Sequence, residues 1–207
     1  LSTATGNINA LSSATRGVFN GGTQPSVVDT IEYITFAAKG NATDFGDLSA
    51  ARYSTANVSS STRGVFIGGE TGSAVVDIIE YITMASTGDV TDFGDLTTDR
   101  DNSAGVSDGH GGLEAYDPRL PSVGRGVGIF GGGYTSPAYL NVIEEILIPT
   151  LGNSSDFGDL SQARAYTRGG ACSYTRGVMM GGFTGSIVNT MDSVSYTHLT
   201  LPTILRV

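Results

Sequence analysis

The 207-residue sequence has no tryptophan, one cysteine, two histidines and a single lysine, Lys39. A lone Cys172 excludes an internal disulfide framework, and we expect it to be a small buried side chain. Two histidines, of which His110 is one, are too few for a histidine-rich metal site. A formal net charge of −9 excludes the basic groove that binds a nucleic acid.

Long hydrophobic runs are also missing. A membrane-spanning helix needs about 18 or more consecutive apolar residues, and no such run occurs, so we expect no membrane partner. No useful length has the spacing of an amphipathic helix. The chain instead has 30 glycines and a hydrophobic content of 39%, which is enough for a packed core.

Three short phrases recur along the chain. Arg-Gly-hydrophobic begins at Arg16, Arg63, Arg125 and Arg176, each time shortly before a glycine pair. Ile-Glu-Tyr-Ile occupies 31–34 and 79–82 and becomes Ile-Glu-Glu-Ile at 143–146. Asp-Phe-Gly-Asp-Leu occupies 44–48, 92–96 and 156–160. The second and third phrases begin 13 residues apart in every copy, so they belong to one repeated unit.

The repeated unit predicts an all-β propeller of four-stranded antiparallel blades. In the second copy we expect strands near 55–59, 64–67, 76–84 and 90–93, where β-branched and aromatic residues lie between glycine-, serine- and aspartate-rich turns. Four short strands per unit are typical of a propeller blade, and a single blade buries too little core to be stable alone.

The same pattern predicts a core and its contacts. We expect Val65, Ile67, Ile79 and Phe93, with their counterparts, to be buried, and Phe93 to be a wedge between blades. Asp95 is expected to accept backbone hydrogen bonds in a turn.

The copies set the expected boundaries. Residues 1–192 are predicted to form a propeller fragment with blades near 6–48, 53–96 and 101–160 and a partial blade over 165–192. The third copy holds about fourteen extra residues, best placed at 111–124, and their prolines indicate a loop. Leu1 aligns with Leu48, so we expect the array to continue before the first residue.

Residues 193–207 depart from the repeat. After Asp192 the pattern predicts a continuation similar to Tyr-Ile-Thr, but the chain reads Ser-Val-Ser-Tyr-Thr-His. This stretch resembles a translated sequencing adapter, as a metagenomic fragment can carry, and we expect it not to belong to the native protein. It could still take a strand position at an open sheet edge, with poor packing.

The phrases resemble the kelch repeat, in which a hydrophobic strand ends in a glycine pair, a tyrosine strand follows and an arginine opens the next blade. Matching residues are Gly68, Gly69, Tyr81 and Arg100, with Arg52 and Arg164 in other copies. The kelch tryptophan is absent, and Phe45, Phe93 and Phe157 stand near its position. The phrases are also similar to repeats in structural proteins of marine tailed phages. This second resemblance implies a place on a virion, in a tail or fibre.

The kelch resemblance implies that the loop after the glycine pair and the loop carrying the arginine open on one face. These loops are 70–74 and 97–101, with equivalents at 23–26, 49–53, 134–139 and 161–166. Candidate binding residues on them are Glu70, Thr71, Arg52, Arg100, Arg164, Tyr134 and Tyr139. The expected partner is a host-surface glycan or protein, or another virion protein.

Chemistry-bearing residues favour no catalytic site. Glu32, Glu80 and Glu144 recur once per copy, which favours a structural or solvated role over a glycosidase pair. Asp44 and Asp47, with their equivalents, offer oxygen ligands for Ca²⁺, but two carboxylates are too few, so we expect no cofactor. We therefore expect a non-enzymatic structural or binding protein. The alternative is a carbohydrate-active propeller enzyme whose catalytic residues lie in further blades.

Overall fold

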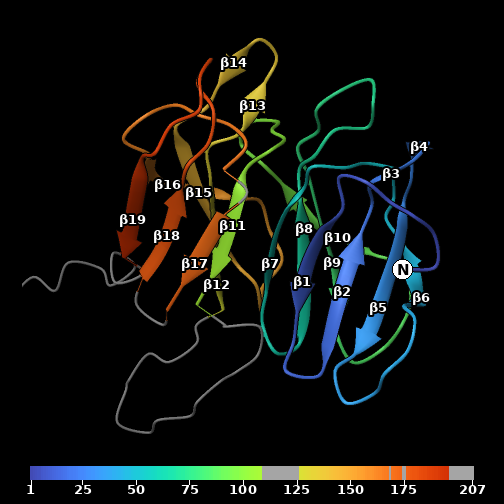
Figure 1. The fold of residues 1–207 in the computed structure, drawn as a ribbon. Coiled ribbons are helices and arrows are strands. Elements are labelled where there is room, and N and C mark those ends of the chain that lie inside the picture. The colour runs from blue at the N-terminus through green and yellow to red at the C-terminus, as the bar shows by residue number, and fades with distance from the viewer. Residues whose placement is uncertain (109–125, 168, 174–175, 196–207) are drawn as a thin grey trace, which may run out of the picture.

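A computed structural model describes residues 1–108, 126–167, 169–173 and 176–195. Within these ranges the chain has no helix and forms four small antiparallel sheets, arranged as the blades of a four-bladed β-propeller (Figure 1). The predicted all-β propeller is therefore confirmed. The expected insert at 111–124 lies outside the described residues. No helix among the described residues could span a bilayer.

The first three blades each have four strands in one plan. The first blade consists of β1 (Asn9–Ser12), β2 (Arg16–Asn20), β5 (Thr30–Thr35) and β6 (Thr43–Asp47). The second consists of β7 (Ala56–Ser59), β8 (Arg63–Ile67), β9 (Ile78–Thr83) and β10 (Thr91–Asp95). The third consists of β11 (Ala104–Ser107), β12 (Val127–Gly131), β15 (Val142–Leu147) and β16 (Ser155–Asp159).

The fourth blade has three described strands, β17 (Gly169–Cys172), β18 (Arg176–Met180) and β19 (Met191–Ser195). β19 extends past residue 192, and Ser193 and Val194 pair with Val178 and Gly177. Three residues of the stretch that we expected to lie outside the repeat are thus part of a sheet, and the rest of it, 196–207, lies outside the described residues. Cys172 is half-buried rather than fully buried, against the prediction.

The innermost strands β1, β7, β11 and β17 lie side by side around the propeller axis (Figure 1). Side chains join consecutive members of this set. Ser59 Oγ donates to the Ser12 carbonyl at 2.8 Å, and Ser107 Oγ donates to the Ser59 carbonyl at 2.7 Å. The same serine therefore links the second blade to the first and the third blade to the second, while Cys172 holds this position in the fourth blade.

The outer strands explain the glycine of the Asp-Phe-Gly-Asp phrase. The Gly88 N–H donates to the Phe45 carbonyl at 2.7 Å, so a loop of the second blade lies against β6 of the first. A Cβ on Gly46 would lie 2.3 Å from the Gly88 carbonyl oxygen, a distance that no side chain tolerates. The same close approach recurs between Gly94 and Gly152 of the next pair of blades. Only glycine fits because the neighbouring backbone occupies the side-chain position.

The second aspartate of this phrase is the last residue of the outer strand. Asp95 is the last residue of β10, and its N–H donates to Asn153 Oδ1 of the third blade at 3.1 Å. The N–H of Asp47 donates in the same way to Asp89 Oδ1 of the second blade. The contact formed at Asp95 is a donation by its N–H to the next blade, and the expected acceptance of backbone hydrogen bonds in a turn is not observed among the described residues.

The phenylalanine of the phrase forms a bulge and a wedge. Asp92 lies opposite Glu80 and Gly94 opposite Ile79, so Phe93 is the extra residue of a β-bulge. Its side chain packs with Ile146 and Ile148 of the third blade. Val65, Ile67, Ile79 and Phe93 are all buried, which confirms the predicted core. Phe157 is only half-buried, so the wedge role does not extend fully to the third copy.

The arginine of the Arg-Gly-Val phrase ties the opposite end of the first blade to the second, and that of the second blade to the third. The Arg16 guanidinium lies over the Tyr33 ring, 4.7 Å from its centroid, and Nη1 donates to the Met84 carbonyl of the second blade at 2.7 Å. Arg63 repeats both contacts, with the Tyr81 ring and with the Ile148 carbonyl of the third blade. A cation over an aromatic face adds attraction to the hydrogen bond.

Burial of the wedge gives a stability prediction. Replacing Phe93 with alanine removes a side chain packed between two blades, so we expect the free energy of unfolding to fall by about 3–5 kcal/mol. Phe157→Ala, at the half-buried equivalent position, should cost clearly less. Urea unfolding followed by circular dichroism measures both. Equal losses for the two variants would contradict the wedge role.

Candidate recognition face

The two loops expected to share a face do so, and they pair with each other. In every blade an isolated bridge joins the residue after the arginine position to the residue after the glycine pair. These bridges are Gly6–Thr23, Tyr53–Glu70, Asp101–Tyr134 and Ala165–Phe183. The hairpins β3 (Thr23–Gln24)–β4 (Ser26–Val27) and β13 (Tyr134–Thr135)–β14 (Ala138–Tyr139) stand at this end of the molecule (Figure 1). We call this end the loop face.

The three candidate arginines are not on the surface of the loop face. Arg52, Arg100 and Arg164 have no exposed area. Each is paired with an acid of the third strand of the following blade: Arg52 with Glu80 at 2.7 Å, Arg100 with Glu144, and Arg164 with Asp192 at 2.7 Å. Their proposed contact with a ligand is thereby corrected, because the side chains turn into the protein to meet these carboxylates.

The glutamates that recur once per copy are correspondingly structural. Glu80 and Glu144 are buried in these pairs. Glu144 also accepts hydrogen bonds from the Thr97 hydroxyl at 2.6 Å and from Ser154. Thr5 stands where the later copies have arginine, and Glu32 of the first blade accepts from the Ser2 N–H at 2.9 Å. The carboxylate at this position accepts a hydrogen bond in each of these blades, and that of Glu144 accepts from three residues.

Burial affects the ionisation of the pairs. It lowers the pKa of Arg52 and of Arg100 from the ordinary value, while Glu80 and Glu144 act in the opposite direction. For Asp192 burial favours the neutral acid, but hydrogen bonds from Ser161 and Arg164 outweigh it and hold the pKa below its ordinary value. The charged form of Asp192 is thus stabilised by direct contact.

Glu70 and Thr71 remain at the surface, in the hairpin of the second blade. Both side chains are partly exposed. Burial of Tyr53, together with its hydrogen bond to Glu70, raises the pKa of the Tyr53 hydroxyl to about 12. Thr71 Oγ1 contacts the Ala74 carbonyl at 3.2 Å within the hairpin tip. These residues form a polar part of the loop face.

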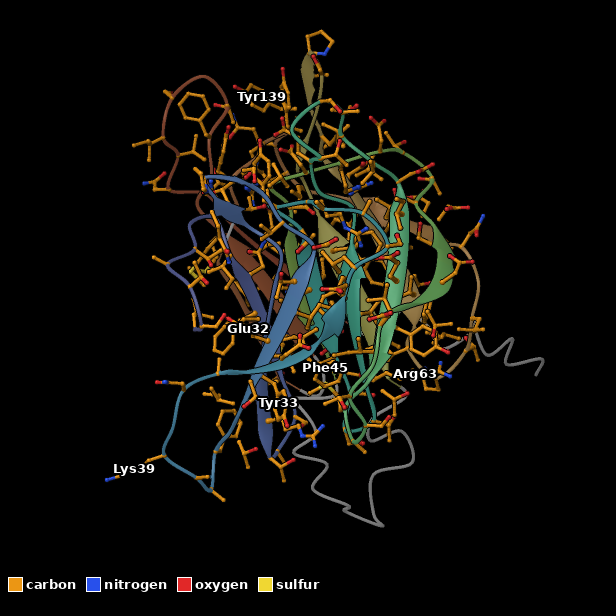
Figure 2. The ribbon with its side chains drawn as sticks, turned by 90° about the vertical axis from the view of Figure 1, so that its right-hand side faces the viewer. Glu32, Tyr33, Lys39, Phe45, Arg63 and Tyr139 are labelled. Atoms are coloured by element: carbon orange, nitrogen blue, oxygen red, sulfur yellow. The ribbon has the colours of Figure 1, made fainter. Side chains whose placement is uncertain are left out.

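Tyr134 and Tyr139 belong to an aromatic cluster on the loop face. Their ring centroids are 5.6 Å apart, and Tyr139 lies edge-on to Phe183 of the fourth blade at 6.1 Å. Phe183 also contacts Tyr166, which is 50% exposed. Figure 2 shows Tyr139 at this end of the molecule and Lys39 at the opposite end. We call Tyr134, Tyr139, Tyr166 and Phe183 the aromatic cluster.

Sequence reasoning missed Phe183 as a member of this cluster. Phe183 directly follows the glycine pair Gly181–Gly182, as Tyr134 follows Gly132–Gly133. The shared position after a glycine pair was therefore the signal in the sequence that could have placed Phe183 on the same face as Tyr134. The highly exposed Ile187, at 89%, lies in the same short hairpin and is bridged to Phe183.

The charge of the loop face is negative. The described loops at this end carry Glu70 and Asp99, both partly exposed, and the exposed Asp29 and Asp77. Arg52, Arg100 and Arg164 are the arginines that the described parts of these loops contain, and all three are buried. A ligand of the loop face therefore meets aromatic rings and carboxylates rather than cations.

A small polar pocket of about 100 Å³ lies at the centre of the loop face, over the ends of the inner strands. Asn9, Thr55, Asn57 and Ser103 contribute to its wall. Several of these groups already bond to each other or to Asn20: Asn57 Nδ2 donates to Asn20 Oδ1 at 2.7 Å, and Asn20 Nδ2 donates to Thr55 Oγ1. The pocket lies among the first three blades, and part of its wall is the polar packing between the first two.

Among the described residues, no three His, Cys, Asp or Glu side chains gather in a metal-binding arrangement. The Asp47 side chain is exposed. Its pKa is raised from the ordinary value, most strongly by the small part of it that is buried and then by repulsion from Asp29, Asp89 and Asp44. His110 lies outside the described residues.

No protein-family model matches the chain, and no curated protein matches it in sequence.

The buried Arg100–Glu144 pair gives a second stability prediction. Arg100→Met leaves an uncompensated buried carboxylate, so we expect a loss of about 3–5 kcal/mol in the free energy of unfolding. The double variant Arg100→Met, Glu144→Leu removes both charges and should be more stable than the single variant. Chemical denaturation of the three proteins tests this. A double variant less stable than Arg100→Met would contradict the role of the pair.

Tyr53 provides a prediction on ionisation. A carboxylate that accepts from the phenol stabilises its protonated form, so Glu70→Gln should move the Tyr53 pKa from about 12 toward its ordinary value. Part of the elevation should persist, since burial is its largest cause. NMR titration of the Tyr53 ring carbons provides the measurement. An unchanged midpoint in the variant would show that Glu70 does not contribute.

Proposed function

We propose that this chain is a non-enzymatic binding propeller whose loop face recognises a neutral glycan on a host surface. The observation that carries the proposal is the aromatic cluster, which gathers three tyrosines and a phenylalanine from two blades on the face where all the hairpins stand. Aromatic side chains supply rigid apolar contact area, and tyrosine adds a hydroxyl for hydrogen bonding. Both features suit the mixed apolar and hydroxyl faces of a sugar ring.

The charge of the loop face supports a neutral ligand. Glu70, Asp29, Asp77 and Asp99 surround the hairpins, while Arg52, Arg100 and Arg164 are buried. Like charges placed opposite each other at an interface are costly. Sialylated or sulfated glycans should therefore bind less well than neutral ones.

The scaffold supports recognition by loops. Repeated backbone bonds hold each pair of loops, whereas the hairpin tips differ from blade to blade: Thr-Gln-Pro-Ser, Glu-Thr-Gly-Ser, Tyr-Thr-Ser-Pro and Phe-Thr-Gly-Ser. Binding residues are commonly found on variable loops that a rigid framework positions. This arrangement favours recognition over catalysis.

The kelch-like identity and the virion location belong to the same proposal. They are supported by the glycine pairs, the recurring arginines and the phrases Arg-Gly-Val-Phe and Thr-Asp-Phe-Gly-Asp-Leu, which are similar to repeats of tailed-phage structural proteins. The missing tryptophan is the departure from the kelch pattern; Phe45 and Phe93 stand near its position in the sequence and are buried.

A glycan array tests the proposed function. We expect the purified chain to bind neutral glycans and the variant Tyr139→Ala, Tyr166→Ala to lose at least tenfold in affinity, or about 1.4 kcal/mol. Phe36→Ala is the matched control, because Phe36 is 54% exposed and follows β5 at the opposite end of the first blade. This variant should bind as the unmodified chain does.

Three outcomes would overturn this function. Binding that persists in the double tyrosine variant would exclude the aromatic cluster as the contact surface. A preference for anionic glycans would contradict the charge argument. Release of free sugar from a bound glycan would favour the alternative of a carbohydrate-active enzyme.

A further inference from the structure

The fourth blade differs from the others at its outer edge. In the first three blades a strand with the sequence Thr/Ser-Asp-Phe-Gly-Asp pairs with the third strand: β6 with β5, β10 with β9 and β16 with β15. β19 is the third strand of the fourth blade, and among the described residues it pairs only with β18. An unpaired strand edge presents N–H and C=O groups that can bind another strand.

The side chain at the centre of this edge is uncovered. Ile31, Ile79 and Ile143 each lie opposite the glycine of the outer strand, and they are 0%, 0% and 1% exposed. Met191 holds the same position in the fourth blade and is 65% exposed. In the first three blades the outer strand therefore buries the isoleucine opposite its glycine, and the equivalent Met191 of the fourth blade stays exposed.

A second position is also unfilled. The leucine after each outer strand packs beside the first glycine of the pair: a Cβ on Gly21, Gly68 or Gly132 would lie 3.5, 3.3 or 3.1 Å from the Cδ1 of Leu48, Leu96 or Leu160. At Gly181 the nearest atom is the Val188 carbonyl oxygen at 3.9 Å, with no leucine beside it. The unfilled space beside Gly181 lies in the fourth blade, as the open edge of β19 does. It is a separate observation, because it concerns the surroundings of Gly181 and not the strands that pair with β19.

The conformation of β19 is fixed by its contacts within the fourth blade. β19 pairs with β18 over its whole length, and Asp192 forms the ion pair with Arg164 that corresponds to Arg100–Glu144 in the complete third blade. A strand that binds here meets a preorganised surface, which lowers the cost of association.

We propose that the β19 edge binds an extended Thr-Asp-Phe-Gly-Asp-Leu strand from a further repeat unit of the same type. The three such strands of this chain are each paired in their own sheets, so the occupant is a strand from another unit. It lies antiparallel to β19, with its glycine opposite Met191 and its leucine beside Gly181. Main-chain bonds supply affinity, and these two side-chain positions supply specificity. The inference does not depend on the proposed glycan function.

A peptide with the sequence of residues 89–97 tests this proposal in trans. Labelled with a fluorophore and titrated into the full chain, it should increase in anisotropy with saturation. Met191→Asp places a charge under the bound strand and should weaken binding at least tenfold. Ile187→Asp is the matched control, since Ile187 is 89% exposed in the hairpin of the same blade, and it should bind as the unmodified chain does.

Two further measurements identify the site. Peptides in which the glycine is replaced by valine or the leucine by serine should bind more weakly than the original peptide. Amide hydrogen exchange should show protection of β19 on peptide binding, with β6, β10 and β16 unchanged. No binding at about 1 mM peptide, the weak end of the affinity scale, would overturn the proposal. So would binding that Met191→Asp leaves intact, or protection confined to another strand.

Discussion

The arginine that follows each outer strand joins two blades through one residue. Its backbone docks on the glycine pair of the blade before it, where the Gly69 N–H donates to the Arg100 carbonyl and the Gly133 N–H donates to the Arg164 carbonyl, both at 2.9 Å. Its side chain reaches the acid of the blade after it. A buried guanidinium needs such a partner because an unpaired buried charge is strongly destabilising. These two contacts fix the position of the segment that connects consecutive blades. That segment in turn positions both loops of the loop face.

This use of arginine determines the chemistry of the surface. Because the arginines of these loops are buried in ion pairs, the charged groups left at the surface of the loop face are acids, beside hydroxyls, aromatic rings and the aliphatic Ile187. The repeated backbone bonds and ion pairs between blades lie below the hairpin tips, so the tips can differ in sequence while the frame below them stays the same. A rigid acidic frame with aromatic tips is the physical basis for proposing that the loop face recognises a neutral ligand.

The same repeated contacts make an incomplete blade conspicuous. Gly46 and Gly94 are each covered by a loop of the next blade, while nothing lies within 4 Å of a Cβ placed on Gly158. Phe157 is half-buried and Met191 is exposed, whereas their counterparts Phe93 and Ile79 are buried. A repeat protein gains its stability from neighbours, so each unit is only as buried as the units beside it allow.

Much of this structure could be predicted from the sequence, because the features concerned are local or repeat with the copy. The strand positions followed from runs of β-branched residues, and burial of Val65, Ile67, Ile79 and Phe93 followed from the repeated pattern. That the loops of the loop face lie at one end followed from the kelch resemblance. Tertiary structure decided which charges meet. Arg52 and Glu80 are 28 residues apart and Arg100 and Glu144 are 44 apart, since the insert lengthens the third copy. Arginine and glutamate each recur once per copy, but recurrence does not reveal that an arginine turns inward to a glutamate in the following blade. Phe183 likewise joins Tyr139 only because adjacent blades bring their hairpins together. Periodicity reports how a residue sits in its own strand, whereas partners from different blades are set by how the sheets pack.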